Sequence, residues 1–254
     1  MVATTPNEIE FEKYRKRGAY HWENYFGSVF RVDSFLRGRY DLVIELLDTA
    51  GASQSSRVLE IGCGDGALSG LTYKRFQCEL HGTEPSADGI RFCREMFSKH
   101  NLKGTFEVVG GYSLPYDDNS FDFIILADVI EHLQHPDQML WEIRRLLRTG
   151  GRAIVTTPVR TQELPEDAMH VQEFFPSELI GLCTEYFDRS TITIVYSHPV
   201  VWHQLYSYGV KHIRSLIRLY CRIVDKWFGR NLFLQRQGKC KWKNFKQQAI
   251  VVVK

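Results

Sequence analysis

The sequence feature that most constrains the fold is an apolar run that breaks into alternating glycines, Val58-Leu59-Glu60-Ile61-Gly62-Cys63-Gly64-Asp65-Gly66. A segment compatible with a helix, 67–76, follows it directly. This order predicts a strand that passes through a tight turn into a helix. Glycines suit such a turn because they adopt backbone conformations that a Cβ forbids and let a ligand approach the main chain. We therefore predict a nucleotide-binding turn here.

The charges around the turn favour one kind of nucleotide. Dinucleotide-binding folds use G-x-G-x-x-G and place a pyrophosphate at the helix N-terminus. This turn is instead G-x-G-x-G, with Glu60 before it and Asp65 inside it. Two carboxylates repel a pyrophosphate, whereas they suit a ligand that offers an ammonium group and hydroxyls. On this chemistry we predict S-adenosylmethionine rather than NAD.

Strand and helix patterns alternate after the turn. We predict strands at 57–61, 78–83, 104–109, 121–127 and 152–157, and helices at 67–75, 87–99 and 136–148. Such alternation predicts an α/β fold, a mostly parallel sheet with helices on both faces and its ligand at the carboxyl ends of the strands. Later in the chain we expect a helix that starts at Ser177, a strand at 191–196 and a terminal strand at 250–253.

The two ends of the chain look like additions to this core. Residues 8–17 and 34–50 have helical patterns, with an aromatic cluster, Tyr20-His21-Trp22, between them. Residues 202–228 also have a helical pattern, just before the last strand. We predict an N-terminal helical cover (1–55), a cofactor-binding core (56–198), and a basic helical insertion with the final strand (199–254).

Five segments in register, over about residues 57–160, resemble the class I S-adenosylmethionine-dependent methyltransferases. They are Glu60-x-Gly62-x-Gly64-x-Gly66, His81 to Ser86, Gly110 to Tyr116, Phe121-Asp122 to His132-Leu133, and Leu146 to Gly151. The resemblance implies a Rossmann-like sheet of seven strands, the last antiparallel. It also implies that Glu84 binds the ribose hydroxyls, that 110–116 flanks the adenine and that Asp128 faces the methionine end.

The cofactor-binding residues expected on this basis are Glu60, Gly62, Cys63, Gly64, Gly66, Glu84, Pro85, Ser86, Gly111, Tyr112, Ser113 and Asp128.

Two histidines are candidate bases, with Asp128 as a third catalytic candidate. Asp128 and His132 are four residues apart, so on a helix they share a face and the carboxylate orients the imidazole. An N-cap of a short helix at 129–133 is the alternative role of Asp128. His170 lies in the loop after the fifth strand, which in this fold reaches over the acceptor. A structural histidine is the alternative for both.

The set Asp128, Glu131, His132 and His170 also resembles the metal ligands of some superfamily members, including small-RNA 2′-O-methyltransferases. Those enzymes usually have Glu where this chain has Asp128, and the string Ile-Glu-His-Leu is common in metal-free relatives. A divalent metal is therefore not expected.

Cysteine usage and hydropathy limit the cellular setting. The six cysteines are scattered without a C-x-x-C pair, so neither a zinc site nor a disulfide framework is indicated. No segment has the ~20 apolar residues of a membrane span, and residues 1–10 lack a signal-peptide pattern. We expect a cytoplasmic protein, with association at a membrane surface as an alternative.

Charge is distributed unevenly. Residues 199–254 hold 12 Lys or Arg and a single acid, Asp225, although the whole chain has a net charge of only +2. Residues 202–230 therefore suggest a solvated face over a packed apolar stripe, possible contact with an anionic membrane, or, less favoured, nucleic-acid binding. A homodimer in which the stripe packs on a partner subunit is a further alternative.

We predict a methyltransferase that acts on a hydroxyl, less favourably an amine, of a small-molecule, natural-product or sugar-containing and lipid-linked acceptor. The alternatives are a metal-assisted RNA 2′-O-methyltransferase and a non-catalytic cofactor-binding partner protein.

Overall fold

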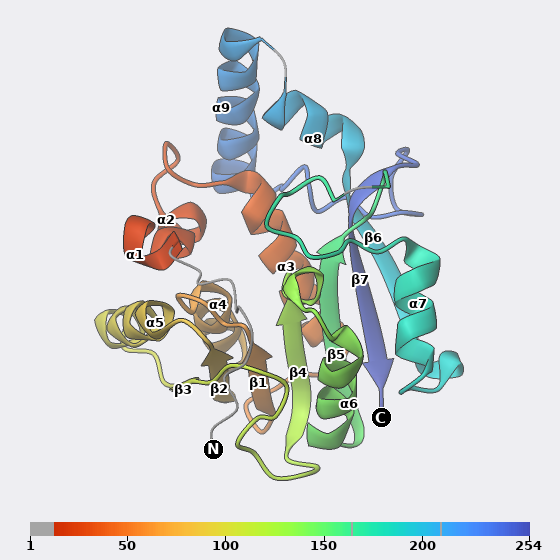
Figure 1. Ribbon diagram of the computed structural model, residues 1–254. Helices are drawn as coiled ribbons and strands as arrows, with labels where there is room; N and C mark the ends of the chain where they lie inside the picture. The colour runs from red at the N-terminus through yellow and green to blue at the C-terminus, as the bar shows by residue number, and fades with distance from the viewer. Residues whose placement is uncertain (1–12, 164, 209) are drawn as a thin grey trace.

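A seven-stranded sheet carries the fold of the computed structural model, which describes residues 13–163, 165–208 and 210–254 (Figure 1). The strands lie in the order β3-β2-β1-β4-β5-β7-β6. β1 to β5 are parallel to one another, whereas β7 is antiparallel to both β5 and β6. The predicted Rossmann-like α/β class with an antiparallel last strand is confirmed.

The strands are β1 (Arg57–Ile61), β2 (Glu79–Glu84), β3 (Thr105–Val108), β4 (Phe121–Ala127), β5 (Leu147–Pro158), β6 (Thr193–Pro199) and β7 (Phe245–Val253). The helices are α1 (Lys13–Arg17), α2 (Tyr20–Phe26), α3 (Ser34–Thr49), α4 (Ala67–Phe76), α5 (Ala87–Lys99), α6 (Pro136–Leu146), α7 (Pro176–Thr184), α8 (Val200–Ser207) and α9 (Lys211–Phe228). Two 3₁₀ turns, η1 (Ile130–His132) and η2 (Arg189–Thr191), complete the described elements.

Two apolar layers form the core because the central strands are buried on both faces. On one face, Ile125 of β4 belongs to a cluster with side chains of α2, α3, α4 and α5. On the other face, the neighbouring Ile124 belongs to a cluster with α6 and α7. A third and smaller cluster joins α8, α9 and the start of α3, and it includes Tyr206, Cys221 and Phe233.

Several predicted boundaries are wrong. Helix α7 begins at Pro176, with Phe175 as its N-cap, because the Glu178 side chain accepts a hydrogen bond from the Phe175 backbone N–H (2.8 Å) and proline fits a first helical turn. Ser177 is therefore inside the helix. The predicted helix at 202–228 is two helices, α8 and α9. The last strand starts five residues earlier than expected. Of the predicted helix at 8–17, residues 8–12 lie outside the described part.

All six cysteines are free thiols. Among the helices that the structure describes, none combines the length and the apolarity needed to cross a bilayer.

Candidate active site

A large cleft lies at the carboxyl ends of β1, β2, β4 and β5. Its volume is about 2500 Å³, and it is lined by the last residues of these strands, including Ile61, Glu84, Ala127 and Pro158. Helices α1, α2 and α3 also contribute residues to its wall. The parallel topology places the loops that follow these strands at one edge of the sheet.

The glycine turn has the strained geometry that its sequence predicts. Gly62, Gly64 and Gly66 all have φ between +55° and +75°, a left-handed conformation that side chains disfavour. A Cβ at Gly64 would also lie 2.0 Å from the hydroxyl of Tyr14. Helix α1 thus packs directly on the turn, and the close approach is possible only because this position has no side chain.

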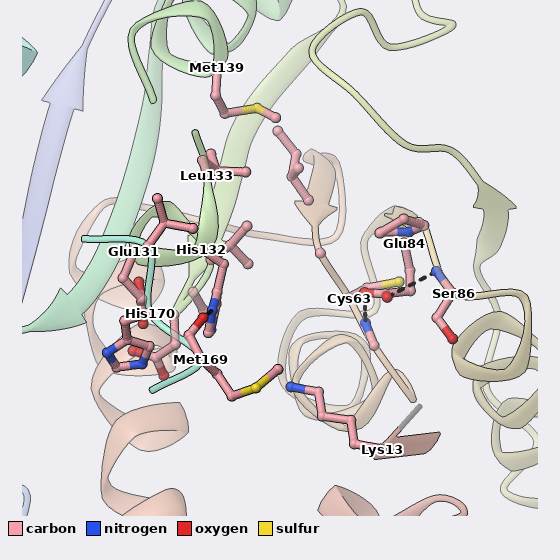
Figure 2. Close-up of a pocket in the computed structure, with 18 of the residues that line it drawn as sticks. Lys13, Cys63, Glu84, Ser86, Glu131, His132, Leu133, Met139, Met169 and His170 are labelled. Carbon is pink, nitrogen blue, oxygen red and sulfur yellow. Dashed lines mark hydrogen bonds between the residues drawn. The ribbon is translucent and has the colours of Figure 1, made fainter. Parts of the chain in front are cut away.

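Glu84, at the end of β2, is the acid most directly joined to the turn. Its Oε2 accepts a hydrogen bond from the backbone N–H of Gly64 and its Oε1 from that of Ser86, both at 3.1 Å (Figure 2). Ser86 in turn caps α5, because its hydroxyl accepts from Gly89 N–H. Burial raises the pKa of Glu84. The carboxylate therefore fixes the turn and faces the cleft at the position expected for ribose recognition.

The two acids of the turn itself have different surroundings. Glu60 lines the cleft, but its carboxylate accepts a hydrogen bond from the Ser69 hydroxyl, and burial raises its pKa to about 8. Asp65 does not line the cleft. Its carboxylate accepts from the His21 backbone N–H (2.9 Å), and its carbonyl accepts from the Trp22 indole (2.6 Å). Asp65 therefore has a structural role, because it attaches α2 to the turn, rather than the predicted role of repelling a pyrophosphate.

Asp128 neither orients the His132 ring nor caps the segment that follows it, the two roles predicted for it. Its carboxylate pairs with Arg39 (2.8 Å) and accepts hydrogen bonds from Gln247 (2.6 Å) and Thr156 (3.3 Å). The N-cap of η1 is Val129, and the segment is a 3₁₀ turn rather than an α-helix. Asp128 therefore does not cap this turn, and its carboxylate faces α3 and β7. It still lines the cleft, where its left-handed backbone (φ +53°) ends β4.

The two histidines meet although 37 residues separate them. The backbone N–H groups of Val171 and Gln172 donate to the carbonyl of Glu131 (2.9 and 3.1 Å), which fastens the loop after β5 to η1. The rings of His132 and His170 consequently lie edge to face, with centroids 5.0 Å apart. The structure thus brings both predicted bases together in the cleft.

Each ring is oriented through Nδ1. That atom of His132 donates to the Met169 carbonyl (2.9 Å), and that of His170 donates to Oε1 of the buried Glu173 (2.7 Å). A neutral imidazole that donates through Nδ1 carries its lone pair on Nε2. Burial lowers the pKa of His132 and so favours its neutral form.

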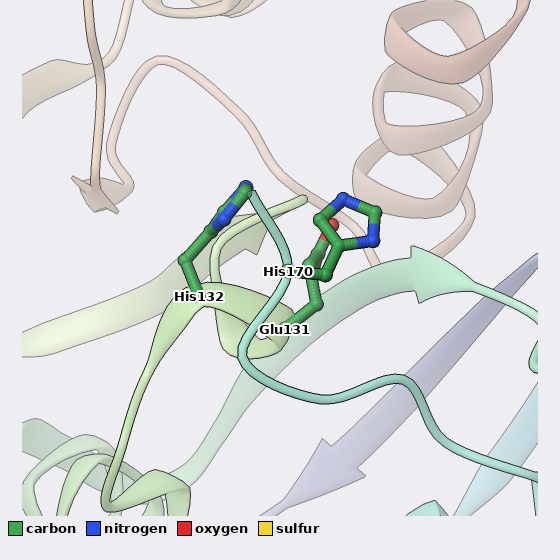
Figure 3. A group of neighbouring side chains, drawn as sticks. All are labelled: Glu131, His132 and His170. Carbon is green, nitrogen blue, oxygen red and sulfur yellow. The ribbon is translucent and has the colours of Figure 1, made fainter. Parts of the chain in front are cut away.

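Glu131, His132 and His170 form a compact group at this point (Figure 3). One ligand atom from each lies within 4.8 Å of the others, whereas Asp128 is not in the group. Glu131 is only 1% exposed, and its Oε2 has no hydrogen-bond partner among the described residues. Burial and the nearby Asp128 charge raise the pKa of Glu131 to about 8.

The groups that line the cleft suit the expected cofactor. Carboxyl groups face the cleft from β1 and β2, the glycine turn lines it, and Gly111, Tyr112 and Ser113 line the side expected for adenine. Of the predicted cofactor-binding residues, only Gly66 does not line the cleft; its missing Cβ instead leaves room for Cys93, whose Sγ would lie 2.3 Å away.

Sequence reasoning missed several residues of the cleft. Lys13, Tyr14, Arg39 and Glu173 belong to no motif, and their elements reach the cleft only through tertiary packing. The Lys13 side chain extends into the cleft toward Met169 (Figure 2). Burial lowers the pKa of its amine. A charged residue within a helical pattern, such as Lys13 or Arg39, gives no signal that would have identified its position.

Comparison with known proteins gives consistent matches. A family described as "Methyltransferase domain" matches residues 52–209. A fatty-acid O-methyltransferase of Mycolicibacterium smegmatis is 32% identical over 115 residues, which are 44% of this chain and 41% of that protein. Methyltransferase GfsG of Streptomyces halstedii is 25% identical over 160 residues, 62% of this chain and 58% of that one. The chain thus spans only part of the curated relatives that it matches.

Among solved structures, phosphoethanolamine N-methyltransferase 2 of Haemonchus contortus in complex with S-adenosyl-L-methionine aligns with a TM-score of 0.66. The alignment covers 99% of this chain and 61% of that one, at 17% identity. At that identity the likeness concerns the fold.

Proposed function

Because the chain belongs to the class I S-adenosylmethionine-dependent methyltransferases, we propose that it transfers a methyl group to a hydroxyl of a small-molecule acceptor. The observation that carries the choice of a hydroxyl is the pair formed by His170 and Glu173 in the cleft (2.7 Å). A hydroxyl must lose its proton as it is methylated, so a positioned base accelerates the reaction. A natural-product, sugar-containing or lipid-linked alcohol fits this proposal, with an amine as the less favoured acceptor.

Separate groups of residues hold the cofactor and accept the proton of the acceptor. Glu84, Glu60 and the glycine turn would hold S-adenosylmethionine, which supplies an activated methyl group when bound. His170 takes the acceptor proton at Nε2, and Glu173 stabilises the imidazolium that results. His132 lies beside it as a second base. Transfer then depends mainly on proximity and alignment, which the cover over the cleft favours by excluding water.

The test is a screen of alcohol and amine acceptors with His170→Ala, Glu173→Gln and a control. A general base contributes about 10²- to 10⁴-fold to the rate, so His170→Ala should lower kcat by that order. His100→Ala, outside the cleft at the end of α5, should leave the rate unchanged. Full activity of His170→Ala would refute the base assignment. An amine accepted in preference to every alcohol would overturn the choice of oxygen.

A second candidate is metal-assisted transfer, and one observation favours it. The buried and unpartnered Glu131 Oε2 lies in a group with two histidines, each already oriented through Nδ1. Two histidines and one carboxylate, with partners that fix the rings, are a common arrangement for a divalent cation. Such a cation would bind the acceptor oxygen and favour its deprotonated form.

Calorimetric titration of Mn²⁺, Mg²⁺ and Zn²⁺ into chelator-treated protein tests the second candidate. Binding that Glu131→Gln abolishes, together with loss of turnover in EDTA, would establish it. Full turnover in EDTA would exclude it and leave the two histidines as the candidate bases. If metal dependence is found, RNA is the acceptor to try next, since salt-dependent RNA affinity would indicate a ribose hydroxyl as the target.

A further inference from the structure

Helix α9 has an apolar side that faces away from the rest of the protein. Ile213, Leu216, Tyr220 and Trp227 are 57%, 68%, 53% and 72% exposed, and Phe228 at the helix end is 75% exposed. The first four are spaced by three, four and seven residues, so they form one stripe along the helix. In Figure 1 the helix projects from the end of the molecule above α3. The expectation that the apolar stripe packs on the core holds for only one edge of it, where Ile217, Cys221 and Val224 join the cluster with α8 and the start of α3.

The packed side of α9 combines this apolar edge with polar contacts. Asp225 is buried and pairs with Arg37 of α3 (2.8 Å). Arg218 donates to the Tyr206 carbonyl of α8 (2.8 Å), and Arg222 donates to the Phe30 carbonyl (2.9 Å). These contacts fix the rotation of the helix about its axis. The outward apolar stripe is therefore a consequence of specific contacts on the opposite side.

The basic residues of α9 differ in their partners from others of this region, of which Arg236 pairs with Glu45 and Lys246 with Glu166. Residues 199–254 hold 12 Lys or Arg against one acid. In the described ranges, the salt bridges include none between a carboxylate and a Lys or Arg of α9. Arg218 and Arg222 bond to carbonyls, which leave their positive charge uncompensated. Arg218 and Arg222 lie on the packed side, whereas Lys211, which begins α9, and Arg230, just after its end, are exposed at the two ends of the apolar and aromatic stripe.

We propose that α9 docks on an anionic lipid surface, with the stripe in the headgroup layer and the basic residues near the lipid phosphates. An amphipathic helix with aromatic residues on one side and Lys or Arg beside them is the form that interfacial helices take. Each basic residue near an anionic leaflet adds to the attraction. At 18 residues the helix is ~27 Å long, enough to lie along the surface as an extended contact.

The position of α9 relative to the cleft relates this docking to the acceptor. His203 and Tyr208, from α8 and the residues just before α9, line the cleft. One end of the cleft therefore opens beside the docking helix. A membrane-bound enzyme would meet an acceptor with a lipid tail at this end. This last step rests on the proposed function, whereas the docking itself does not.

Cosedimentation with vesicles tests the docking directly, without any acceptor. The full chain is mixed at low salt with vesicles of phosphatidylcholine alone or with phosphatidylglycerol. We expect binding to the anionic vesicles only, reduced by raised salt, with a blue shift of tryptophan emission. Leu216→Ser/Trp227→Ser should weaken the partition coefficient about tenfold or more, because two large apolar side chains no longer enter the interface.

Controls separate docking from loss of folding and from other occupants. Val108→Ser removes an apolar side chain of 52% exposure on the edge strand β3 and should bind vesicles as the wild type does. Retained calorimetric binding of S-adenosylmethionine shows that the double variant is folded. No binding of the wild type to anionic vesicles would overturn the proposal. So would a dimer that the double variant dissociates, or binding of single-stranded RNA that persists where vesicle binding fails.

Discussion

Replacing Glu84 by glutamine should separate its two roles, fixing the glycine turn and binding the cofactor. The substitution keeps the shape of the side chain and removes its charge. In the structure both carboxylate oxygens accept backbone N–H groups, from Gly64 and Ser86. A glutamine has only one oxygen, so its NH₂ group must face one of these N–H donors. That donor is left without an acceptor in a buried place.

The magnitude follows from the bonds that are lost. A hydrogen bond that involves a charged group contributes about 1.5–3 kcal/mol, and about 1.4 kcal/mol is a factor of ten in affinity. We therefore expect Glu84→Gln to raise the Kd for S-adenosylmethionine about 10- to 150-fold. The unpaired donor should also lower the free energy of unfolding by about 1–3 kcal/mol.

Isothermal titration calorimetry measures the first effect and urea unfolding the second. Glu95→Gln is the matched control, since Glu95 is an exposed acid on α5 and the charge change is the same. A Kd that rises less than threefold, in a variant that folds normally, would refute the assignment of Glu84 to the cofactor. Equal losses in Glu84→Gln and Glu95→Gln would mean that net charge, rather than this carboxylate, sets the affinity.

Three further predictions concern stability. Gly66→Ala should cost about 2–5 kcal/mol in urea unfolding, because φ is +75° and the new Cβ would meet the Sγ of Cys93; a loss under 1 kcal/mol would contradict this geometry. Asp225→Ala should cost about 2–4 kcal/mol by leaving Arg37 unpaired, and the Arg37→Met/Asp225→Leu double variant should recover part of it; no recovery would argue against the pair as the cause. Glu60 has a folded-state pKa of about 8, above its ordinary 4.5, so its contribution to stability is complete below about pH 4.5 and is lost as the pH rises toward 8. Between pH 5 and 8, the free energy of unfolding of the ligand-free wild type should therefore decrease with rising pH by up to ~1.4 kcal/mol per pH unit more than that of Glu60→Gln. Parallel curves for the two proteins would count against the raised pKa of Glu60.

The sequence predicted the class of fold and the cofactor side of the site because both depend on local patterns. The glycines at 62, 64 and 66 predicted the left-handed turn that the backbone adopts. The alternation of apolar strands and amphipathic helices predicted the parallel order, and strand ends meet at one edge in such a sheet. Glu84 and Gly111 to Ser113 were named from the family resemblance, and in the structure they end the second strand and follow the third.

The acceptor side was predicted only in part, because its contacts join distant segments. His132 and His170 were identified from the resemblance, but their orientation depends on Met169 and Glu173, which no spacing rule connects to them. Asp128 stands four residues before His132, yet its carboxylate bonds to Arg39 of α3. Sequence separation predicts a neighbour only on a regular helix, and this segment is a 3₁₀ turn.

Helix α9 shows the same limit at the level of a whole element. Its periodicity alone established an amphipathic helix with a strong positive charge. Which side packs was decided by the tertiary structure, through the Asp225–Arg37 pair and the arginine contacts to backbone carbonyls. A pattern of apolar residues fixes which side chains share a face. It does not fix where that face points, because that depends on what the rest of the chain offers to each side.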